Sequence, residues 1–282
     1  MKKIKTALAA FLAAITLLPL AACGNDIPET ETESGSSTST LLPPVDEPTQ
    51  DEDDTTTEEE TTPEKEPEPV PAVDEYFLCT ADNVNLRAGA GTSYAVIGSA
   101  EKNTSYAIIG KTGNWYKTYY RGKTAYFYAE YAAVFSIEKS QDEKVEEVLE
   151  YAYATIGVPY VYGAVRLHDG KGNFLKGFTT QKFDCSSLVQ YAFYYGADEL
   201  LDVTTRTQFL QGEKIAKSEL SRGDCIYFTN DERRNKTGVE RVGHVAIYLG
   251  DNYILHTASD YARIEKMTAK RWNYYIEARR FT

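Results

Sequence analysis

One segment near the middle of the chain has the spacing of a buried amphipathic helix. In FDCSSLVQYAFYYG, residues 183–196, apolar side chains recur every three or four positions, at Leu188, Tyr191, Ala192 and Tyr195. Asp184 or one of the two serines is suited to cap the start, and Gly196 is suited to end the helix. Cys185 therefore lies in or just before the first turn. The free N–H groups and the helix dipole should stabilise a thiolate there, although many cysteines are simply small buried hydrophobic residues.

The pattern around this segment predicts helices followed by strands. In residues 137–282, another helical stripe ends at Gly157, ahead of Pro159, and consists of Val145, Val148, Leu149 and Ala152. From Gly223 onward, alternating apolar positions predict the strands DCIYFT, VGHVAIYLG, NYILHTAS and YYIEARRF. Helices first and an antiparallel meander afterwards predict an α+β fold.

Residues 76–135 have the pattern of a small all-β barrel. Short alternating runs are broken by Gly, Asn and Lys, as in VNLRAGAGTSYAVIG and GNWYKTYYRGKTAYFYAEY. Strand propensity and core packing explain most of the aromatic residues in this region. A minority should face outward and stack on sugars or peptide; the candidates are Trp115, Tyr116, Tyr119, Tyr120, Tyr126 and Tyr128.

Residues 1–23 have the layout of an export signal. Three lysines precede an apolar stretch over residues 7–18, which is short for a membrane span. The stretch ends in LAAC, which resembles the lipobox of bacterial lipoproteins. The resemblance implies cleavage before Cys23, lipidation of Cys23 and anchoring to the membrane by two or more acyl chains. The alternative is an ordinary signal peptide in which the cysteine occurs by chance.

Residues 24–75 form an acidic segment rich in Thr and Pro, with 18 Asp or Glu residues against one lysine. Such a segment buries too little apolar surface to offset its ordering entropy, so we expect a disordered tether. At about 3.3 Å per residue it would reach on the order of 150 Å, from a membrane into a cell wall. The tether also explains the net charge of −12, because residues 76–282 contain 26 basic and 24 acidic residues. No basic patch indicates nucleic-acid binding.

The chain has four cysteines and three histidines. With Cys23 lipidated, an odd number remains in an exported protein, so at least one of Cys79, Cys185 and Cys225 is free or pairs between molecules. Cys79 and Cys225 lie in apolar strand-like stretches, which indicates that both are buried. No pair has the spacing of a zinc site, so we expect no metal and no other cofactor.

Two of the histidines lie in one predicted hairpin, GHVAIYLGDNYILHTAS. The buried face of its first strand is formed by Val245, Ile247 and Leu249. His244 points to the other face, and the face of His256 depends on the loop, because a slip of one residue reverses every side chain. A two-residue turn would pair Ile247 with His256 and place the two histidines on opposite faces of the hairpin. The loop at residues 250–252, GDN, instead pairs Ala246 with His256 and makes His244 a diagonal neighbour, about 7–8 Å away between Cα atoms. The GDN sequence favours this longer loop.

A cysteine at a helix start and two imidazoles on one sheet face meet the requirements of a thiol nucleophile. One imidazole takes the thiol proton and later protonates the leaving amine, while a second polar group orients the first. The thiolate attacks an amide carbonyl, and water hydrolyses the acyl-enzyme. Helix N–H groups near Cys185 are candidate oxyanion donors. Each histidine alone is better explained by a structural role, but the combination favours catalysis.

The motifs PYVYGAV, FDCSSLVQYAFYYG, RGDCIYF, GHVAIYLG and ILHTAS occur in the order found in the NlpC/P60 cysteine peptidases. They cover most of residues 145–282. The resemblance implies a papain-like core and cleavage of peptidoglycan stem peptides, typically after γ-D-glutamate. The protein would then be a γ-D-glutamyl-diamino acid endopeptidase that works as a monomer outside the cytoplasm.

The resemblance also implies a role for each matching residue. Cys185 would be the nucleophile, His244 the general base and His256 the orienting third member. The hydroxyl of Tyr160, in the PY motif, would help to stabilise the oxyanion. Asp184 and Ser186, which flank the nucleophile, would bind substrate near the cleaved bond. In some family members these positions bind a free peptide amine.

Residues 76–135 resemble a bacterial SH3 (SH3b) domain over essentially their whole length, although RAGAG stands where that family usually has a Gly-Pro pair. An SH3b domain ahead of an NlpC/P60 domain is a common arrangement in the peptidase family. The resemblance divides the chain into a signal peptide, a tether, an SH3b domain over 76–135 and a peptidase domain over 137–282. A weaker hypothesis is that SH3b tyrosines form one wall of the active site.

The chain departs from the peptidase pattern in several places. Ser187 replaces the glycine of the usual DCSGL motif, and Ala164 stands where a second glycine is common. The segment 163–183 is longer than usual. This insert and the charged segment DERRNKTGVE should border the cleft and influence specificity. His168, in the Gly-rich insert, is expected to be exposed.

Two alternative functions remain open. The same site could serve an N-acetylmuramoyl-L-alanine amidase or an acyl-transfer relative of the same superfamily. The protein could also be a non-catalytic wall-binding lipoprotein, with the SH3b domain as the active part. The presence of Cys185, His244 and His256 argues against the non-catalytic alternative.

Overall fold

The structure, a computed structural model, describes residues 72–282, which form one compact unit. The predicted signal peptide, Cys23 and most of the predicted tether lie outside the described residues. The first strand, β1, begins at Val73. The predicted tether therefore ends before residue 75, and Asp74 is part of the folded sheet. Within the described range, no helix is long and apolar enough to cross a membrane.

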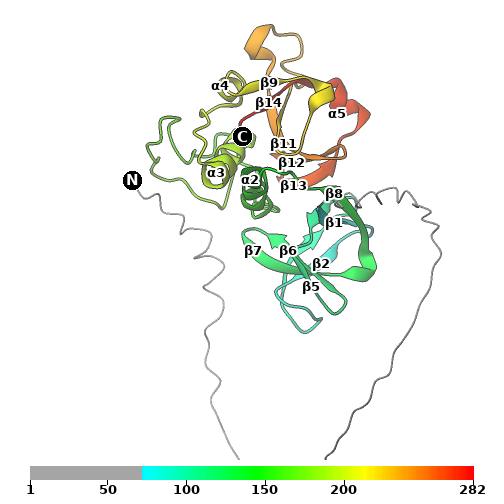
Figure 1. The fold of residues 1–282 in the computed structure, drawn as a ribbon. Coiled ribbons are helices and arrows are strands. Elements are labelled where there is room, and N and C mark those ends of the chain that lie inside the picture. Colours follow the sequence, from blue (N-terminus) through cyan, green and yellow to red (C-terminus); the bar gives the residue numbers. More distant parts are fainter. Residues whose placement is uncertain (1–71) are drawn as a thin grey trace, which may run out of the picture. The chain divides into compact units, whose positions relative to one another are not determined.

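Two antiparallel sheets form the framework (Figure 1). The larger has the strand order β8-β1-β4-β13-β12-β11-β10-β14-β9, and the smaller has the order β3-β2-β7-β6-β5. The strands are β1 Val73–Cys79, β2 Val84–Arg87, β3 Val96–Ala100, β4 Ser105–Ala107, β5 Gly110–Thr112, β6 Trp115–Tyr120, β7 Lys123–Tyr128, β8 Ala132–Glu138, β9 Glu213–Ile215, β10 Cys225–Phe228, β11 His244–Gly250, β12 Tyr253–Ala258, β13 Tyr261–Lys266 and β14 Tyr275–Arg280.

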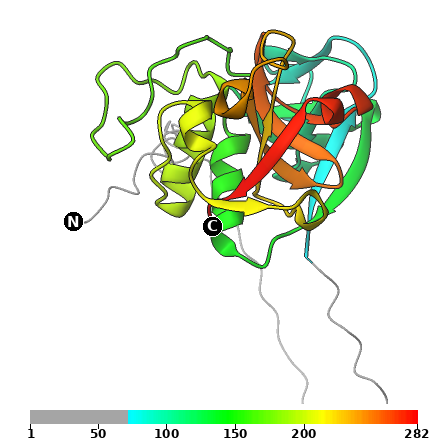
Figure 2. The same cartoon turned by 90° about the horizontal axis from the view of Figure 1, so that it is seen from above.

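Two long helices pack together on the larger sheet. The helices are α2 Glu143–Tyr153, α3 Cys185–Ala197, α4 Thr205–Gln208 and α5 Ala269–Asn273, with 3-10 turns at Ala129–Tyr131, Lys217–Glu219 and Gly238–Arg241. Helix α3 contacts α2, β11 and β12. Figure 2 shows α2, in green, beside α3, in yellow-green. Helices followed by an antiparallel meander confirm the predicted α+β class.

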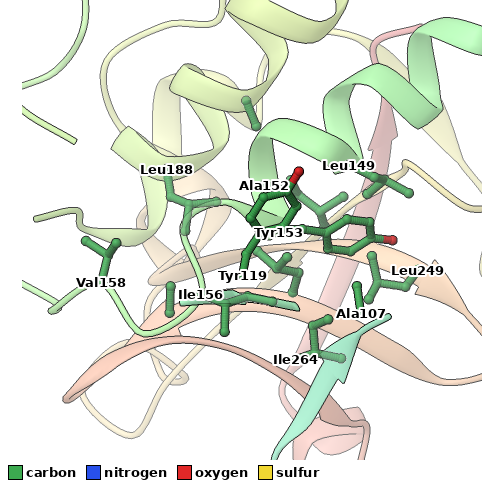
Figure 3. Close-up of a cluster of buried hydrophobic side chains, with 14 of the residues drawn as sticks. Ala107, Tyr119, Leu149, Ala152, Tyr153, Ile156, Val158, Leu188, Leu249 and Ile264 are labelled. Carbon is green, nitrogen blue, oxygen red and sulfur yellow. The ribbon is translucent and has the colours of Figure 1, made fainter. Parts of the chain in front are cut away.

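The N-terminal strands continue the sheet of the C-terminal half. Strand β4 pairs with β13 through Ser105 and Ile264, so β1, β4 and β8 extend the sheet. Figure 3 shows side chains from both regions in one buried cluster, including Ala107, Tyr119, Leu149, Leu188 and Ile264. Regions 76–135 and 137–282, which the sequence divides into two units, thus share a sheet and a core. Each fully buried leucine or isoleucine in this core contributes about 1.5–3 kcal/mol.

Helix α2 follows the predicted stripe but ends early. The four stripe residues are buried, and the N-cap Asp142 accepts a hydrogen bond from Lys144 N. The helix ends at Tyr153 rather than Gly157, because the next backbone bonds join residues three apart, Thr155 N to Ala152 O and Ile156 N to Tyr153 O. Gly157 itself has a φ of +80°. A Cβ on Gly157 would lie 2.3 Å from the Tyr120 ring. Gly157 therefore allows the N-terminal region to approach the end of α2 closely.

Gly196 lies inside α3 and does not end it, contrary to the prediction. The helix continues to Ala197, and the C-cap is Asp198, which has a φ of 60°. A Cβ on Gly196 would lie 2.4 Å from the Val148 Cα atom. The glycine is needed for the close contact between α3 and the backbone of α2.

Arg222 connects the first strand to α2. Its guanidinium forms ion pairs with Asp74 of β1 and Glu146 of α2 and donates to the Tyr76 hydroxyl at 2.9 Å. The Arg222 side chain is 5% exposed, so the pairs are poorly screened by water. This cluster fixes β1 against the C-terminal half of the molecule.

Candidate active site

Cys185 is the first residue of α3, and a reciprocal cap fixes its position. The Asp184 side chain accepts a hydrogen bond from Ser187 N, and Ser187 Oγ accepts one from Asp184 N, both at 2.9 Å. Asp184 is therefore the N-cap, one of the two alternatives that the sequence left open. The Cys185 side chain is buried, and its Sγ lies 3.5 Å from Thr205 Oγ1 of α4.

The thiol does not have the lowered pKa expected of a helix start. Burial raises the pKa of Cys185, and the charge of Asp184 raises it further. The Thr205 hydroxyl and the backbone N–H of Val245 favour the thiolate but do not compensate. The resting thiol is therefore protonated at neutral pH, and it would need a base in order to act as a nucleophile. Because Val245 follows His244, the thiol lies beside the strand that carries the predicted base.

The hairpin of β11 and β12 has the predicted register but a different turn. Ile247 pairs with Leu255, which places Ala246 opposite His256 as predicted. The turn itself has two residues, 251 and 252, both with positive φ. A register shift between Tyr248 and Gly250 adds the extra residue. A bulge in β11, and not a three-residue loop, therefore brings the histidines to one face.

The two histidines contact each other on this face. His244 Nε2 and His256 Nδ1 are 2.9 Å apart. His256 is 3% exposed, and its Nε2 lies 3.2 Å from Glu265 Oε1 of β13. That contact is at ion-pair distance but outside hydrogen-bond geometry. Glu265 also forms an ion pair with Arg271 of α5. The result is a row of polar groups from His244 to Arg271.

Charge and burial determine which nitrogen of each histidine carries a proton. Burial lowers the pKa of both imidazoles, and the neighbouring His256 adds to the large effect on His244. Burial alone would raise the pKa of Glu265, but contact with His256 and the charge of Arg271 lower it from 4.5 to about 2. Ionised Glu265 presents only acceptor oxygens, so its negative charge favours the neutral form of His256 that carries its hydrogen on Nε2. His256 Nδ1 then accepts from His244 Nε2–H, and His244 Nδ1 is left as the basic nitrogen.

A cleft borders Cys185. Its lining includes Tyr160, Arg166, Asp184, Cys185, Thr205 and Glu232. Parts of the insert 163–183 and of the charged segment before Gly243 line it, as predicted. Among the described residues, the lining includes none from 76–135. The hypothesis that SH3b tyrosines form a wall is therefore wrong for this cleft.

Tyr160, Asp184 and Ser186 all lie at the cleft with Cys185. Burial raises the pKa of Tyr160 to about 12, and the nearby Cys185 and Asp184 add to the effect. Tyr160 therefore keeps its proton at neutral pH and can donate a hydrogen bond. Ser186 Oγ donates to Asp184 Oδ1 at 3.0 Å. Asp184 also forms an ion pair with Arg166 at 2.8 Å.

Three residues of this arrangement have no counterpart in the sequence predictions: Arg166, Thr205 and Glu265. Glu265 faces His256 because β13 pairs with β12, and Ile254 is its partner in that register. Alternation along YARIEK would have indicated its face, but the pairing of β12 with β13 was needed to bring it to the histidine. Arg166 and Thr205 lie in irregular or very short elements, where periodicity gives no signal.

His168 is fully buried, contrary to its predicted exposure. Its Nδ1 accepts a hydrogen bond from Gly170 N at 3.0 Å, and its carbonyl accepts one from Gln190 of α3 at 3.2 Å. The insert therefore packs on α3 and does not project into solvent. Across residues 72–282, no group of three or more His, Cys, Asp or Glu side chains is arranged to hold a metal ion. Cys79, Cys185 and Cys225 are free and buried, as the sequence indicates for Cys79 and Cys225.

Comparison with known proteins identifies the two regions. Residues 157–280 match the family model for the NlpC/P60 family. These residues form an NlpC/P60 domain. Residues 82–133 match the model for the bacterial SH3 domain, so the NlpC/P60 domain follows an SH3b domain, as the resemblance implied.

Two curated relatives and one solved structure illustrate the similarity. A gamma-DL-glutamyl hydrolase of Bacillus subtilis is 30% identical over 151 residues, which are 53% of this chain and 32% of that protein. Peptidoglycan endopeptidase RipA of Mycolicibacterium smegmatis is 34% identical over 113 residues, 40% of this chain and 21% of that protein. An NlpC/P60 family protein of Bacillus cereus has 19% identity and a TM-score of 0.39, with 74% of this chain and 63% of that chain covered. The chain thus spans about a third or less of these two curated relatives.

Proposed function

We propose that this protein is a cell-wall hydrolase that cleaves peptidoglycan stem peptides. In this proposal Cys185 is the nucleophile, His244 the general base and His256 the residue that orients it. The main support for this proposal is the position of Cys185. It is the first residue of α3, lines a cleft and lies beside β11, whose His244 contacts His256. The names of the relatives, a glutamyl hydrolase and a peptidoglycan endopeptidase, support wall peptides as the substrate class. The proposed bond joins γ-D-glutamate to the diamino acid.

The first chemical step starts from a neutral thiol and a neutral imidazole. His244 Nδ1 takes the proton of the Cys185 thiol as the sulfur attacks the peptide carbonyl carbon and a C–S bond forms. His256 accepts the Nε2–H of His244 and so holds the ring while positive charge develops on it. Glu265 stabilises that charge through His256.

The second half of the reaction releases the two fragments. The Tyr160 hydroxyl and the N–H groups at the start of α3 are the proposed donors to the oxyanion. As the tetrahedral intermediate collapses, the C–N bond breaks and His244 returns its proton to the leaving amine. Water, deprotonated by His244, then hydrolyses the thioester and regenerates the Cys185 thiol.

The proposed location is the outer face of a bacterial cytoplasmic membrane. Cys23 would carry the lipid anchor, and residues 24–71 would let the folded part reach the wall. The near-neutral charge of residues 76–282 is compatible with movement along a charged polymer. We propose that the folded part acts as a monomer.

The test uses the purified full chain in detergent, with a Cys185→Ala variant as control. Each protein is incubated with peptidoglycan and with defined stem peptides, and products are identified by mass spectrometry. Cleavage after γ-D-glutamate that is absent from the control supports the endopeptidase. Release of whole stem peptides from glycan would show the amidase instead. No product from either protein, together with retention on the wall, would leave the non-catalytic binding protein.

A further inference from the structure

The carboxylate beside the nucleophile is already fully occupied. Asp184 Oδ1 accepts hydrogen bonds from Ser187 N at 2.9 Å and Ser186 Oγ at 3.0 Å. Asp184 Oδ2 accepts one from Gly163 N at 3.2 Å and pairs with Arg166 Nη2 at 2.8 Å. The Asp184 side chain is 5% exposed. A carboxylate in a cleft is an obvious partner for a substrate ammonium, but this one has a cation in place.

The guanidinium that occupies Asp184 is itself fixed. Arg166 Nε donates to the Val203 carbonyl at 2.7 Å, and Nη1 donates to the Ala164 carbonyl at 2.5 Å. Arg166 Nη2 also donates to Ser186 Oγ at 3.1 Å. These carbonyls, one in the insert and one just ahead of α4, hold the planar group in one orientation. A substrate ammonium would have to displace a cation held by two carbonyls, a hydroxyl and a carboxylate.

The other charges at the cleft do not replace this carboxylate. Arg206 and Arg233 both pair with Glu240, at 3.6 Å and 3.2 Å. Glu232 is the other carboxylate in the lining, and it is exposed to solvent. An exposed carboxylate binds an ammonium only weakly, because water screens the pair. The ion pair of Arg166 with Asp184 is neutral as a whole, so it leaves no free carboxylate for an ammonium beside Cys185.

We infer that Arg166 sets the substrate class of this site. The ion pair of Arg166 with Asp184 excludes peptides that place a free N-terminal ammonium beside the nucleophile. The site takes peptides that are acylated at that position, as stem peptides still attached to glycan are. Arg166 lines the cleft, and its side chain is 19% exposed, so it can meet an acyl group at that position. The inference rests on the proposed peptidase function and specifies the form of its substrate.

The experiment compares two forms of one stem peptide, with the N-terminal amine free or acetylated. The full-length protein in detergent should cleave the acetylated peptide with a kcat/KM at least tenfold higher at pH 6.5. In Arg166→Gln, Asp184 regains a free oxygen, so the ratio should fall to about one or below, chiefly through faster cleavage of the free-amine peptide. Arg166→Lys keeps the positive charge and should keep the preference. Arg234→Gln, an exposed arginine paired with Asp231, is the matched control.

The ratio of kcat/KM for the two peptides is also measured across a pH series. A purely structural role of Arg166 would leave this ratio independent of pH. A peptide α-amine has a pKa of about 8, so its positive charge is lost between pH 6.5 and 9.5. The preference of the wild-type protein should shrink over that interval. Both peptides meet the same ionisable groups of the cleft, so an effect common to the two peptides cancels in the ratio; these groups include Tyr160, Arg166, Asp184, Cys185, Arg206, Glu232 and Arg233.

Several results would overturn the inference. One is a wild-type protein that prefers the free amine or makes no distinction. Another is a ratio that changes in Glu232→Gln but not in Arg166→Gln, which would place the determinant on the other rim. If the wild-type protein cleaves neither peptide, the proposed peptidase function is refuted. If it cleaves both peptides at equal rates, only the role of Arg166 is refuted. Retained preference in a folded Arg166→Gln protein, checked by its circular dichroism spectrum, would also refute that role.

Discussion

Replacement of Glu265 by glutamine isolates the contribution of the carboxylate behind the histidine pair. The substitution keeps the size of the side chain and removes its charge. In the native protein Glu265 contacts His256 Nε2 at 3.2 Å and pairs with Arg271. A glutamine amide can donate as well as accept, so it no longer requires the Nε2–H form of His256. His256 can then carry its proton on either Nδ1 or Nε2. With the proton on Nδ1, His256 no longer accepts a hydrogen bond from His244 Nε2–H, and the form of His244 with a basic Nδ1 is no longer favoured.

The magnitude follows from the electrostatics of the site. The fall of the Glu265 pKa from 4.5 to about 2 corresponds to about 3 kcal/mol in favour of the ionised carboxylate. Arg271 and Arg263 share this interaction with His256, so only part of it acts on the histidine pair. We expect Glu265→Gln to lower kcat by about 10- to 100-fold, which is about 1.4–2.7 kcal/mol. The KM should change little, because Glu265 is not among the residues that line the cleft.

The assay is hydrolysis of a stem peptide across a pH series, combined with 15N NMR of the histidine rings. The wild-type spectrum should show neutral His256 with its proton on Nε2, and Glu265→Gln should show a mixture of both forms. Glu277→Gln is the matched control, since Glu277 lies in the same sheet and pairs with Lys214 and Arg279. Wild-type kcat and an unchanged His256 tautomer in Glu265→Gln would refute the reasoning.

The same carboxylate predicts a pH dependence of stability. Because the folded-state pKa of Glu265 is depressed, its stabilisation is complete above about pH 4.5 and is lost as the pH falls toward 2. The difference in unfolding free energy between wild-type protein and Glu265→Gln should therefore be up to about 3 kcal/mol at pH 7. Urea unfolding should show the two proteins converging near pH 2, and a constant difference would contradict the assignment.

Three further predictions concern other parts of the molecule. Gly196→Ala should destabilise the fold by about 1–3 kcal/mol, because the new Cβ meets the α2 backbone. Urea unfolding measures the loss, with Gly91→Ala as the control. Equal losses of stability in the two variants would contradict the prediction. Alkylation of Cys185 should be slower than that of a free thiol at pH 7 and keep rising past pH 9, because burial raises its pKa; a plateau below pH 8 would disprove the neutral resting thiol. Arg222→Met should lower stability by about 3–5 kcal/mol, because Asp74 and the α2 glutamate lose their partner; a loss below 1 kcal/mol by the same assay would show that the pairs are not coupled to folding.

Local pattern predicts much of the C-terminal half. The apolar stripes indicated α2 and α3, and the cap alternatives placed Cys185 at a helix start, as the structure has it. The alternation in GHVAIYLGDNYILHTAS was sufficient to predict that Ala246 lies opposite His256. The turn was wrong in detail, because a bulge and a longer loop insert the same single residue and have the same effect on register. Helix ends were also wrong, since Gly157 and Gly196 are explained by contacts across the fold.

The sequence by itself determined which elements form and which reactive residues they carry, because periodicity, capping and turn chemistry act within a few positions along the chain. Only the tertiary structure decided what surrounds those residues. It brought Glu265 to His256 from a neighbouring strand and Arg166 to Asp184 from an irregular insert. It also buried His168 and joined the N-terminal strands to the C-terminal sheet. Burial then reversed the expected pKa of Cys185, because desolvation depends on everything packed around a group and not on its place in a helix.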